Sequence, residues 1–511
     1  MRKIWGGVIM RATLIVITII LQVVFWFGLI YILGDYSEWL FVILIALNLF
    51  SIAYVIVQDT YPENKIPWII LMSTMPLVGG LIYFVFSGHR ISKRRQALYE
   101  QISNNLKLAL LSAKDNHQTL LKDDIQALRQ STYISNTADA PAQTNTQVTY
   151  FKLGEEKLEA LLNELKKAKK FIFLEYFIIE EGKMWSQVEE VLVQKASEGV
   201  DIRIMYDDMG CWLTLPQDFA KRLSSYENID CRVFNRFTHL FNANFNNRDH
   251  RKICVIDGNT GFTGGINIAD EYINHKIKHG HWKDTAIMLK GDAVYNLTVM
   301  FLSMWETMTE QIENYADYAP TKTYEADGVI QPFSDTPLDE HAVGETVYMG
   351  MLNRARDYVY ITTPYLIISR EMRVALMSAA KSGVDVRIIL PGIGDKQFVH
   401  FLSRSYYEEL LKAGVKIYEY TPGFIHSKMF ISDDDISVVG TINLDYRSLS
   451  LHYECAVWMY KASVIQEIKE DFLETQEKCR EITLDNFEHK GKFGILKFTF
   501  LGILRTFSPL M

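Results

Sequence analysis

The sequence contains little cysteine and has no surplus of basic residues. Five cysteines occur among 511 residues, an odd number, and none of them forms a Cys-x-x-Cys pair. This excludes a disulfide framework and a zinc ribbon as the basis of the fold. Acidic residues outnumber basic ones by 61 to 53, which gives a formal net charge of -8. A dedicated nucleic-acid-binding protein usually carries a basic surplus, so no nucleic-acid partner is expected.

Apolar residues are abundant. They make up 49% of the chain, and 13% of the residues are aromatic. This content supports large cores and excludes global disorder. Because one domain usually takes roughly 100 to 200 residues, the length predicts two or three folding units.

The N-terminal region, residues 1–66, is predicted to form two transmembrane helices. Thr13–Leu33 contains no charge over 21 residues, and a helix of that length spans roughly 30 Å, the thickness of a bilayer core. Leu40–Val57 is a second apolar run, and the short link between the two makes them an antiparallel hairpin. A cleaved signal peptide is the alternative, but its apolar region is usually shorter and ends in small residues, whereas this one ends in Tyr31-Ile32-Leu33.

A third apolar segment occupies residues 67–95. Pro76, Gly79 and Gly80 weaken a continuous helix here, so the segment is either a kinked span or a re-entrant or interfacial one. Basic residues flank the whole region: Arg2, Lys3 and Arg11 precede it, and Arg90, Lys93, Arg94 and Arg95 follow it. The positive-inside rule favours an even number of crossings between them. We therefore expect a multi-pass protein of the cell membrane, with its remaining domains on the cytoplasmic side.

Residues 96–147 and 486–511 flank the main body. The first segment is predicted to be an amphipathic helix to about Gln130, followed by Thr137–Gln147, which has the composition of an exposed linker. The C-terminal tail alternates lysine and arginine with phenylalanine, isoleucine and leucine. This pattern suits an interfacial helix attracted to anionic lipid, and equally a helix packed against the main body.

The body between these segments repeats itself. Residues 195–204, KASEGVDIRI, return as AKSGVDVRII at 380–389, and the strand-like run at 171–179 corresponds to 358–368. Strands alternating with amphipathic helices predict an α/β fold. We expect two tandem lobes, residues 148–317 and 318–485, related by a pseudo-two-fold axis.

The two copies agree in a set of polar residues at identical offsets. The second, third, fourth and fifth members follow the histidine by 2, 7, 14 and 17 positions in both copies. The first copy has His250, Lys252, Asp257, Gly264 and Asn267, and the second has His426, Lys428, Asp433, Gly440 and Asn443. A duplicated core is held by apolar positions and does not require the same polar set twice, which favours function over a structural role.

These spacings place the side chains in defined positions. Residues i and i+2 of a strand share a face, so each histidine and its lysine point the same way. Asp257 has the opposite parity and falls in a turn-like Asp-Gly-Asn sequence, which predicts a supporting role. Two imidazoles, two lysines and two asparagine amides form a cationic site suited to a phosphoryl group, with one histidine attacking phosphorus and the other protonating the leaving oxygen.

A metal is not required by this chemistry, and no cofactor is expected. The histidines lack a carboxylate-histidine cluster of familiar ligand spacing. His275, His279 and His281 form a local cluster that could bind a metal, although a polar loop is the favoured interpretation.

The paired H-x-K-x-x-x-x-D motifs resemble the phospholipase D superfamily. The likeness extends to NNRDHRKICVIDG, FTGGINIADEY, HWKD, GFIHSKMFISDD and VVGTINLDYRSL, and together with the N-terminal segments it narrows to bacterial cardiolipin synthases of the membrane-anchored type. One departure is His452-Tyr453, where that family commonly has Asn-Phe. The departure puts the contacts next to the motif in doubt.

The resemblance implies transfer of a phosphatidyl group between two phosphatidylglycerol molecules, which gives cardiolipin and glycerol through a phosphatidyl-histidine intermediate. By the same analogy His250 is the nucleophile and His426 the general acid and base, although the repeats alone do not distinguish them. Asn267 and Asn443 join the lysines in holding phosphate oxygens. Glu454, 28 residues after His426, matches the family's orienting carboxylate, and Asp284 is the candidate for the first lobe.

Two other functions fit the same sequence. A phosphodiesterase of this fold would use water as acceptor, giving phosphatidic acid from a lipid or cleaving nucleic acid, and fold does not decide between acceptors. A catalytically silent membrane scaffold is the second alternative, which the intact histidine, lysine and aspartate in both copies disfavour.

Overall fold

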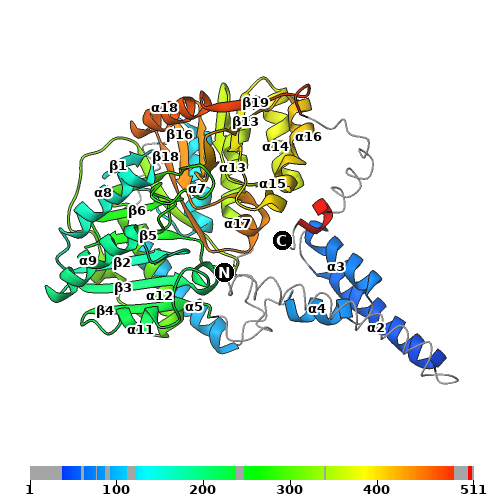
Figure 1. The fold of residues 1–511 in the computed structure, drawn as a ribbon, viewed down its shortest axis with the longest axis horizontal. Coiled ribbons are helices and arrows are strands. Elements are labelled where there is room, and N and C mark those ends of the chain that lie inside the picture. The colour runs from blue at the N-terminus through cyan, green and yellow to red at the C-terminus, as the bar shows by residue number, and fades with distance from the viewer. Residues whose placement is uncertain are drawn as a thin grey trace. The chain divides into compact units, whose positions relative to one another are not determined.

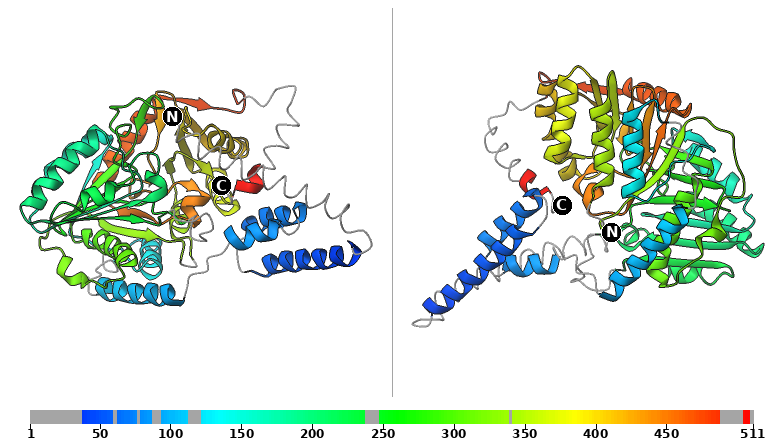
Figure 2. Two further views of the ribbon diagram at one scale, coloured as in Figure 1. Left: turned by 60° about the horizontal axis from the view of Figure 1, so that its bottom comes forward. Right: turned by 180° about the vertical axis from the view of Figure 1, so that it is seen from behind.

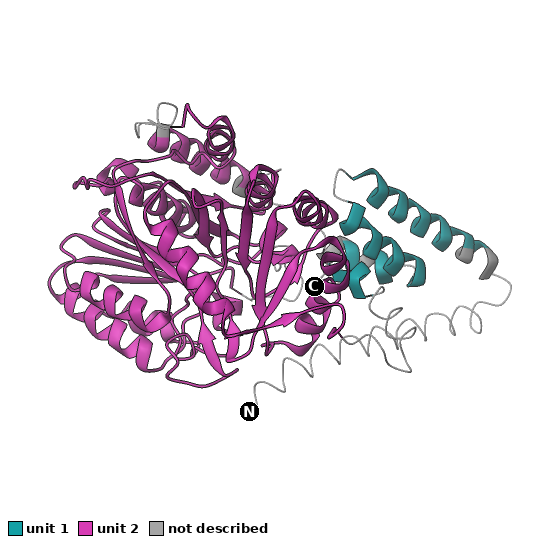
Figure 3. Ribbon diagram, turned by 90° about the horizontal axis from the view of Figure 1, so that it is seen from above, with its two compact units in different colours: residues 1–90, 237–246, 495–511 teal, residues 91–236, 247–494 magenta. Residues whose placement is uncertain are grey.

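The computed structural model describes residues 37–58, 62–75, 78–86, 93–111, 121–236, 247–338, 341–487 and 504–508. The chain divides into two compact units, which Figure 3 shows in different colours. The first comprises residues 1–90, 237–246 and 495–511, and the second comprises residues 91–236 and 247–494.

The described residues of the first unit include helices α2 (Ser37–Val57), α3 (Pro62–Thr74) and α4 (Val78–Phe86). Helix α2 contacts both α3 and α4, and Tyr83 of α4 packs edge-on against Tyr54 of α2 and Trp68 of α3. Helix α3 ends and α4 begins on either side of Pro76, so the third apolar segment is broken where the sequence predicts. Much of the apolar surface of α2 is exposed, including Trp39 and Phe50.

The membrane hairpin stays a prediction. Its first span, Thr13–Leu33, lies outside the described residues, and its second coincides with α2. Within the described part of the chain, no helix meets the combined requirement of length and apolar character for crossing a membrane.

The second unit is built around two large sheets (Figures 1 and 2). The first sheet has the order β1-β8-β6-β5-β2-β3-β4. Its strands are β1 (Thr146–Phe151), β2 (Phe171–Tyr176), β3 (Asp201–Asp207), β4 (Ile229–Phe234), β5 (Lys252–Ile256), β6 (Thr260–Gly264) and β8 (Ala286–Gly291). Strands β2, β3 and β4 are parallel, and the remaining pairs are antiparallel.

The second sheet has the order β19-β13-β12-β10-β15-β16-β18-β9. Its strands are β9 (Val329–Asp335), β10 (Tyr358–Thr362), β12 (Asp385–Pro391), β13 (Lys416–Tyr420), β15 (Met429–Ser432), β16 (Ile436–Gly440), β18 (Glu454–Tyr460) and β19 (Cys479–Ile482). Apart from the extra edge strand β19, this order matches the first sheet strand for strand, since β5 corresponds to β15 and β2 to β10. The predicted duplication of a mixed α/β lobe is therefore confirmed.

Helices cover the sheets in corresponding places. In the first lobe they are α8 (Gly154–Leu165), α9 (Lys183–Ser197), α10 (Asp208–Cys211), α11 (Phe219–Leu223) and α12 (Val294–Thr309), followed by the 3-10 turn η3 (Tyr315–Tyr318). In the second they are α13 (Val343–Arg354), α14 (Arg370–Lys381), α15 (Gln397–Arg404), α16 (Tyr407–Ala413), α17 (Tyr446–Ser450) and α18 (Val464–Gln476). Helices α12 and α18, the last of each lobe, both contribute to a core that the two lobes share.

Alternating side chains of β2 face two different cores. Ile172 and Leu174 lie in a core under α8 and α9, whereas Phe171 and Phe173 lie in the shared core. The shared core also takes in Ile431 of β15 and the residues of α12 and α18 that face it. Two short parallel pairs complete the second unit: β7 (His281–Lys283) with β14 (Gly423–Ile425), and β11 (Leu366–Ile367) with β17 (Leu444–Asp445). The lobes are thus joined by a common core and by β-pairing.

The segment that precedes the first lobe differs from the prediction. Instead of one amphipathic helix, the described residues contain α5 (Lys93–Leu111), which packs on α12, and α7 (Ile125–Thr137), which packs on α13. Within the expected exposed linker, residues 140–143 are buried, and Ala140 and Ala142 are each 1% exposed, whereas Asn145 and Gln147 are exposed. Gln143 forms a backbone bridge with Ile330 in β9. Small side chains let residues 140–143 lie against the second lobe, so the prediction of an exposed linker was wrong for that stretch.

Candidate functional site

Each histidine of the repeated motif lies just before the corresponding strand and is tied to the other lobe through its backbone. His250 precedes β5, and its N–H donates to the carbonyl of Tyr453 at 2.9 Å. His426 precedes β15, and its N–H donates to the carbonyl of Lys283 at 2.7 Å. Both imidazoles are buried, with 7% and 6% of the residue exposed. The two lobes therefore meet at the two histidines.

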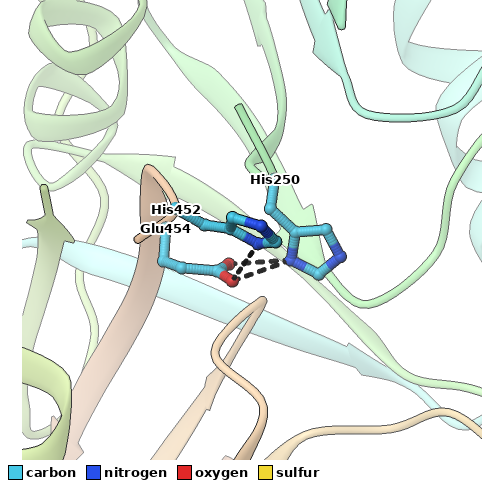
Figure 4. A group of neighbouring side chains, drawn as sticks. All are labelled: His250, His452 and Glu454. Carbon is cyan, nitrogen blue, oxygen red and sulfur yellow. Dashed lines mark hydrogen bonds and ion pairs between the residues drawn. The ribbon is translucent and has the colours of Figure 1, made fainter. Parts of the chain in front are cut away.

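The ring of each histidine is held by a carboxylate of the opposite lobe. Nδ1 of His250 lies 2.9 Å from both carboxylate oxygens of Glu454 (Figure 4). Nδ1 of His426 lies 2.6 Å from Oδ2 of Asp284. The sequence identified both carboxylates, but the assignment of Asp284 to the histidine of its own lobe was wrong. A sequence gives the order of the lobes and not the way they dock, so it could not reveal this exchange.

These contacts fix the tautomer of the neutral rings. An ionised carboxylate only accepts hydrogen bonds, so beside the ionised form of its partner each ring carries the proton on Nδ1 and the lone pair on Nε2. Burial and the positive charges of Lys252 and Lys428 lower the pKa of His250 well below its usual value. Burial and Lys428 lower the pKa of His426 to about 4. At neutral pH both imidazoles are uncharged in the free protein, and each Nε2 is available as a nucleophile or base.

The two carboxylates differ in their surroundings. Burial raises the pKa of Glu454 to about 7. Burial also opposes the charge of Asp284, but His426 and Lys428 outweigh that effect and lower its pKa. Thr441 donates its hydroxyl to Glu454, whereas the corresponding position of the first lobe is Gly265. An added Cβ at Gly265 would lie 2.1 Å from Oδ1 of Asp284, so only glycine leaves room for that carboxylate.

The two lysines share the face of their histidines, as the strand spacing predicts. Nζ of Lys252 donates to the carbonyl of His250, and Nζ of Lys428 donates to the carbonyl of His426. Both lysines are 1% exposed. Burial lowers the pKa of Lys252 to about 8 and that of Lys428 to about 7. A bound anion would stabilise the charged ammonium groups, so this site favours an anionic ligand.

Asp257 and Asp433 lie away from the histidines, at the far ends of β5 and β15. Both adopt positive φ angles, 51° and 53°, in the turns that follow these strands, which confirms the predicted turn at Asp257. The carboxylate of Asp257 accepts three backbone N–H groups at the start of β2, those of Lys169, Lys170 and Phe171. Asp433 accepts the equivalent three at the start of β10, those of Arg356, Asp357 and Tyr358. They support the sheet and do not contact the histidines, which fits the supporting role predicted for Asp257.

The asparagines at offset 17 are buried and partly committed to internal bonds. The amide of Asn267 donates to the hydroxyl of Tyr272 at 2.7 Å, and its oxygen accepts the N–H of Ile178. The amide of Asn443 donates to the hydroxyl of Ser448 at 2.9 Å. Each NH₂ group has two protons, so one donor of each remains for a ligand.

The three clustered histidines of the first lobe do not converge on one point. The ring of His281 bonds to the hydroxyl of Tyr420, His279 packs against Trp282, and His275 is exposed. Among the described residues, only His250, His452 and Glu454 form a group of metal-ligating side chains.

His452 is the residue that the sequence argument passed over. Its ring centre lies 5.7 Å from that of His250, and its Nδ1 lies 4.0 Å from Oε1 of Glu454. The signal was present, because histidine stands here where the family commonly has asparagine.

Comparisons with known proteins agree with this geometry. The chain matches the family described as "Cardiolipin synthase, PLD-like domain" over residues 161–305 and 348–475, and "Phospholipase_D-nuclease N-terminal" over residues 46–88. It is 33% identical to cardiolipin synthase 2 of Bacillus cereus over 465 residues, 89% of this chain and 88% of that one. It is also 33% identical to a cardiolipin synthase of Halalkalibacterium halodurans over 502 residues, 95% of each chain.

Solved structures share the fold at lower identity. A phosphatidylserine synthase of Haemophilus influenzae superposes with a TM-score of 0.57 at 14% identity, covering 75% of this chain and 98% of that one. Taken with the doubled motif and the extent of the sequence matches, these comparisons show that the chain belongs to the cardiolipin synthase family of phospholipase D-like proteins.

Proposed function

We propose that this protein is a cardiolipin synthase, a phosphatidyltransferase that joins two phosphatidylglycerol molecules and releases glycerol. The observation that carries the proposal is that the imidazole of each lobe contacts a carboxylate of the other lobe. Each contact leaves a ring with an available Nε2 beside a buried lysine, as double displacement at phosphorus requires. The named relatives that cover almost the whole chain support the choice of reaction.

In the first step Nε2 of His250 attacks phosphorus and the bond to the glycerol oxygen breaks. His426 supplies the proton that the leaving oxygen needs. Its pKa of about 4 in the free protein reflects burial and the nearby lysine, and an anionic phosphate beside the ring raises that pKa, so the proton is taken up with the substrate. Asp284 stabilises the resulting imidazolium. The products of this step are glycerol and a phosphatidyl group on His250.

In the second step His426 returns to its role as base. It takes the proton from a hydroxyl of the second phosphatidylglycerol, whose oxygen attacks phosphorus while the P–N bond to His250 breaks. Cardiolipin leaves and both rings regain their starting state. Lys252 and Lys428 neutralise the charge that grows on the phosphoryl oxygens, and the spare amide protons of Asn267 and Asn443 are further donors.

We place the reaction at the membrane surface, because both substrates and the product are lipids. The exposed apolar side chains of α2 fit a segment that contacts lipid, and the match over residues 46–88 covers most of this helical unit. The proposed location is the cell membrane with the lobes on the cytoplasmic side. Extraction of membranes with alkaline carbonate tests the anchor, since release of the full-length protein into the soluble fraction would contradict it.

Product analysis tests the reaction. Purified full-length protein is incubated with vesicles of phosphatidylglycerol, and lipids and free glycerol are quantified. We expect cardiolipin and glycerol in equal amounts. Phosphatidic acid without cardiolipin would instead show that water is the acceptor, and absence of both products from a folded protein would favour a scaffold.

A further inference from the structure

His452 is an imidazole without a hydrogen-bond partner in a buried place. Its side chain is only 10% exposed, and neither Nδ1 nor Nε2 bonds to another group among the described residues. Leaving a buried polar group without a partner is unfavourable, because the group gives up its hydrogen bonds to water and gains none in return. Such a ring is poised for a ligand that occupies its nitrogen.

The ligand chemistry follows from the neighbours of this ring. His250, His452 and Glu454 each offer one ligand atom, and all three atoms lie within 4.8 Å of one another (Figure 4). Two imidazoles and one carboxylate, with a fourth position for water, are a ligand set that Zn²⁺ uses.

The distances fit this ion after small movements. Metal–ligand bonds of about 2.0 to 2.1 Å in a tetrahedral arrangement separate neighbouring ligand atoms by roughly 3.3 Å. The present separations are 2.9 Å from Nδ1 of His250 to Glu454 and 4.0 Å from Nδ1 of His452 to Glu454. A small opening of the first contact and a small approach of His452 would bring all three ligands into range.

We propose that His250, His452 and Glu454 form a site for a zinc-like divalent ion, and that its occupation reversibly switches phosphatidyl transfer off. A metal on Nδ1 of His250 takes the lone pair of that nitrogen, so the single ring proton moves from Nδ1 to Nε2. Nε2 then has no lone pair with which to attack phosphorus. The bonds to the metal also remove Glu454 from its role as acceptor for His250.

Two features make this an inhibitory site with moderate affinity. The ammonium groups of Lys252 and Lys428 lie in the same site and repel a dication. The third ligand, His452, has no part in the proposed reaction, so the site depends on a residue that the chemistry does not use. The inhibitory consequence rests on the proposed function, whereas the binding site does not.

Cobalt binding tests the site without any assay of activity. Full-length protein in detergent is titrated with Co²⁺, and visible absorption is recorded for wild type, H452N and H275N, the last being a control that removes an exposed histidine. We expect an intense visible band in wild type and H275N that Zn²⁺ displaces, and an affinity at least about tenfold weaker in H452N, since a lost metal contact typically costs that much or more. Equal spectra for wild type and H452N would overturn the proposal.

Inhibition tests the consequence. We expect Zn²⁺ to suppress cardiolipin formation by wild type and H275N, a chelator to restore it, and H452N to need at least about tenfold more Zn²⁺. H452N removes a ring that makes no hydrogen bond and that the proposed reaction does not use, so its basal activity and unfolding temperature should stay close to wild type. Should H452N fold poorly, the cobalt titration is repeated with H452Q. Equal sensitivity of a folded H452 variant would contradict the proposal, whereas absence of cardiolipin from metal-free wild type would contradict only the proposed function.

Discussion

At the scale of single residues, each histidine has its own carboxylate, Glu454 for His250 and Asp284 for His426. A variant of one carboxylate should therefore impair one half-reaction and spare the other. With a substrate whose leaving group needs no proton, such as a p-nitrophenyl phosphatidyl ester, the first step requires only His250 and its partner Glu454. We expect D284N to release a burst of p-nitrophenol and then stall, because His426 is no longer positioned to act as base. E454Q should show no burst and should lose activity by a factor on the order of 1,000 or more, because its amide can hold the wrong tautomer of His250.

Stopped-flow absorbance measures the burst, and digestion of the stalled D284N protein should locate the phosphatidyl group on His250. The reverse pattern, a burst with E454Q and none with D284N, would show that the roles of the two histidines are exchanged. Loss of the burst in both variants would contradict the separation of roles altogether.

The lysines predict an alkaline limit to activity. Burial lowers the pKa of Lys428 to about 7 and that of Lys252 to about 8, so each ammonium loses its charge as pH rises through that range, whereas below it both are charged. We expect kcat/KM, which reports the free protein, to fall between pH 7 and 8 more steeply than kcat, because bound phosphate holds the charged form. K428R should move this limit upward, since guanidinium stays protonated. A limit that does not move in K428R would exclude Lys428 as its source.

At the scale of strands and turns, Asp257 and Asp433 link the start of one strand to the end of its neighbour. D257A removes the acceptor of three backbone N–H groups and places alanine at a positive φ angle. We expect a loss of about 2 kcal/mol in the free energy of unfolding, with kcat of the folded protein unchanged. D257N keeps an acceptor oxygen and tolerates the angle, so it should lose less. Denaturant titration checks both variants, and a collapse of kcat in a stable D257A would restore Asp257 to the chemistry.

The sequence predicted the elements better than their contacts. The doubled motif identified both histidines and both lysines, because duplication at fixed offsets is visible without structure, whereas Glu454 and Asp284 came from the resemblance to the family. The partner of each carboxylate was not predictable, since it depends on how two lobes dock. The burial of residues 140–143 was not predictable for the same reason, because alanine and proline indicate an exposed loop only when no neighbouring surface covers them. His452 needed the structure, which alone shows its burial beside Glu454.

At the scale of the whole molecule, a buried ion pair joins the two lobes next to the site. Lys283 of β7 in the first lobe lies 2.7 Å from Asp471 of α18 in the second, and both side chains are less than a tenth exposed. The hydroxyl of Tyr150 in β1 also donates to Asp471. Lys283 accepts the backbone N–H of His426 and precedes Asp284 in the chain. The contact between lobes is therefore continuous with the groups that position His426.

Removing one partner of this pair should loosen both the interface and the site. D471N leaves Lys283 buried without its counter-ion, which typically costs about 3 to 5 kcal/mol, while the amide oxygen can still accept from Tyr150. We expect a matching loss in the free energy of unfolding, and a lower kcat with little change in KM, because His426 and Asp284 shift together. The double variant K283M/D471N removes the unpaired charge and should recover at least half of the lost stability. Full additivity of the two single variants would show that the pair does not couple the lobes.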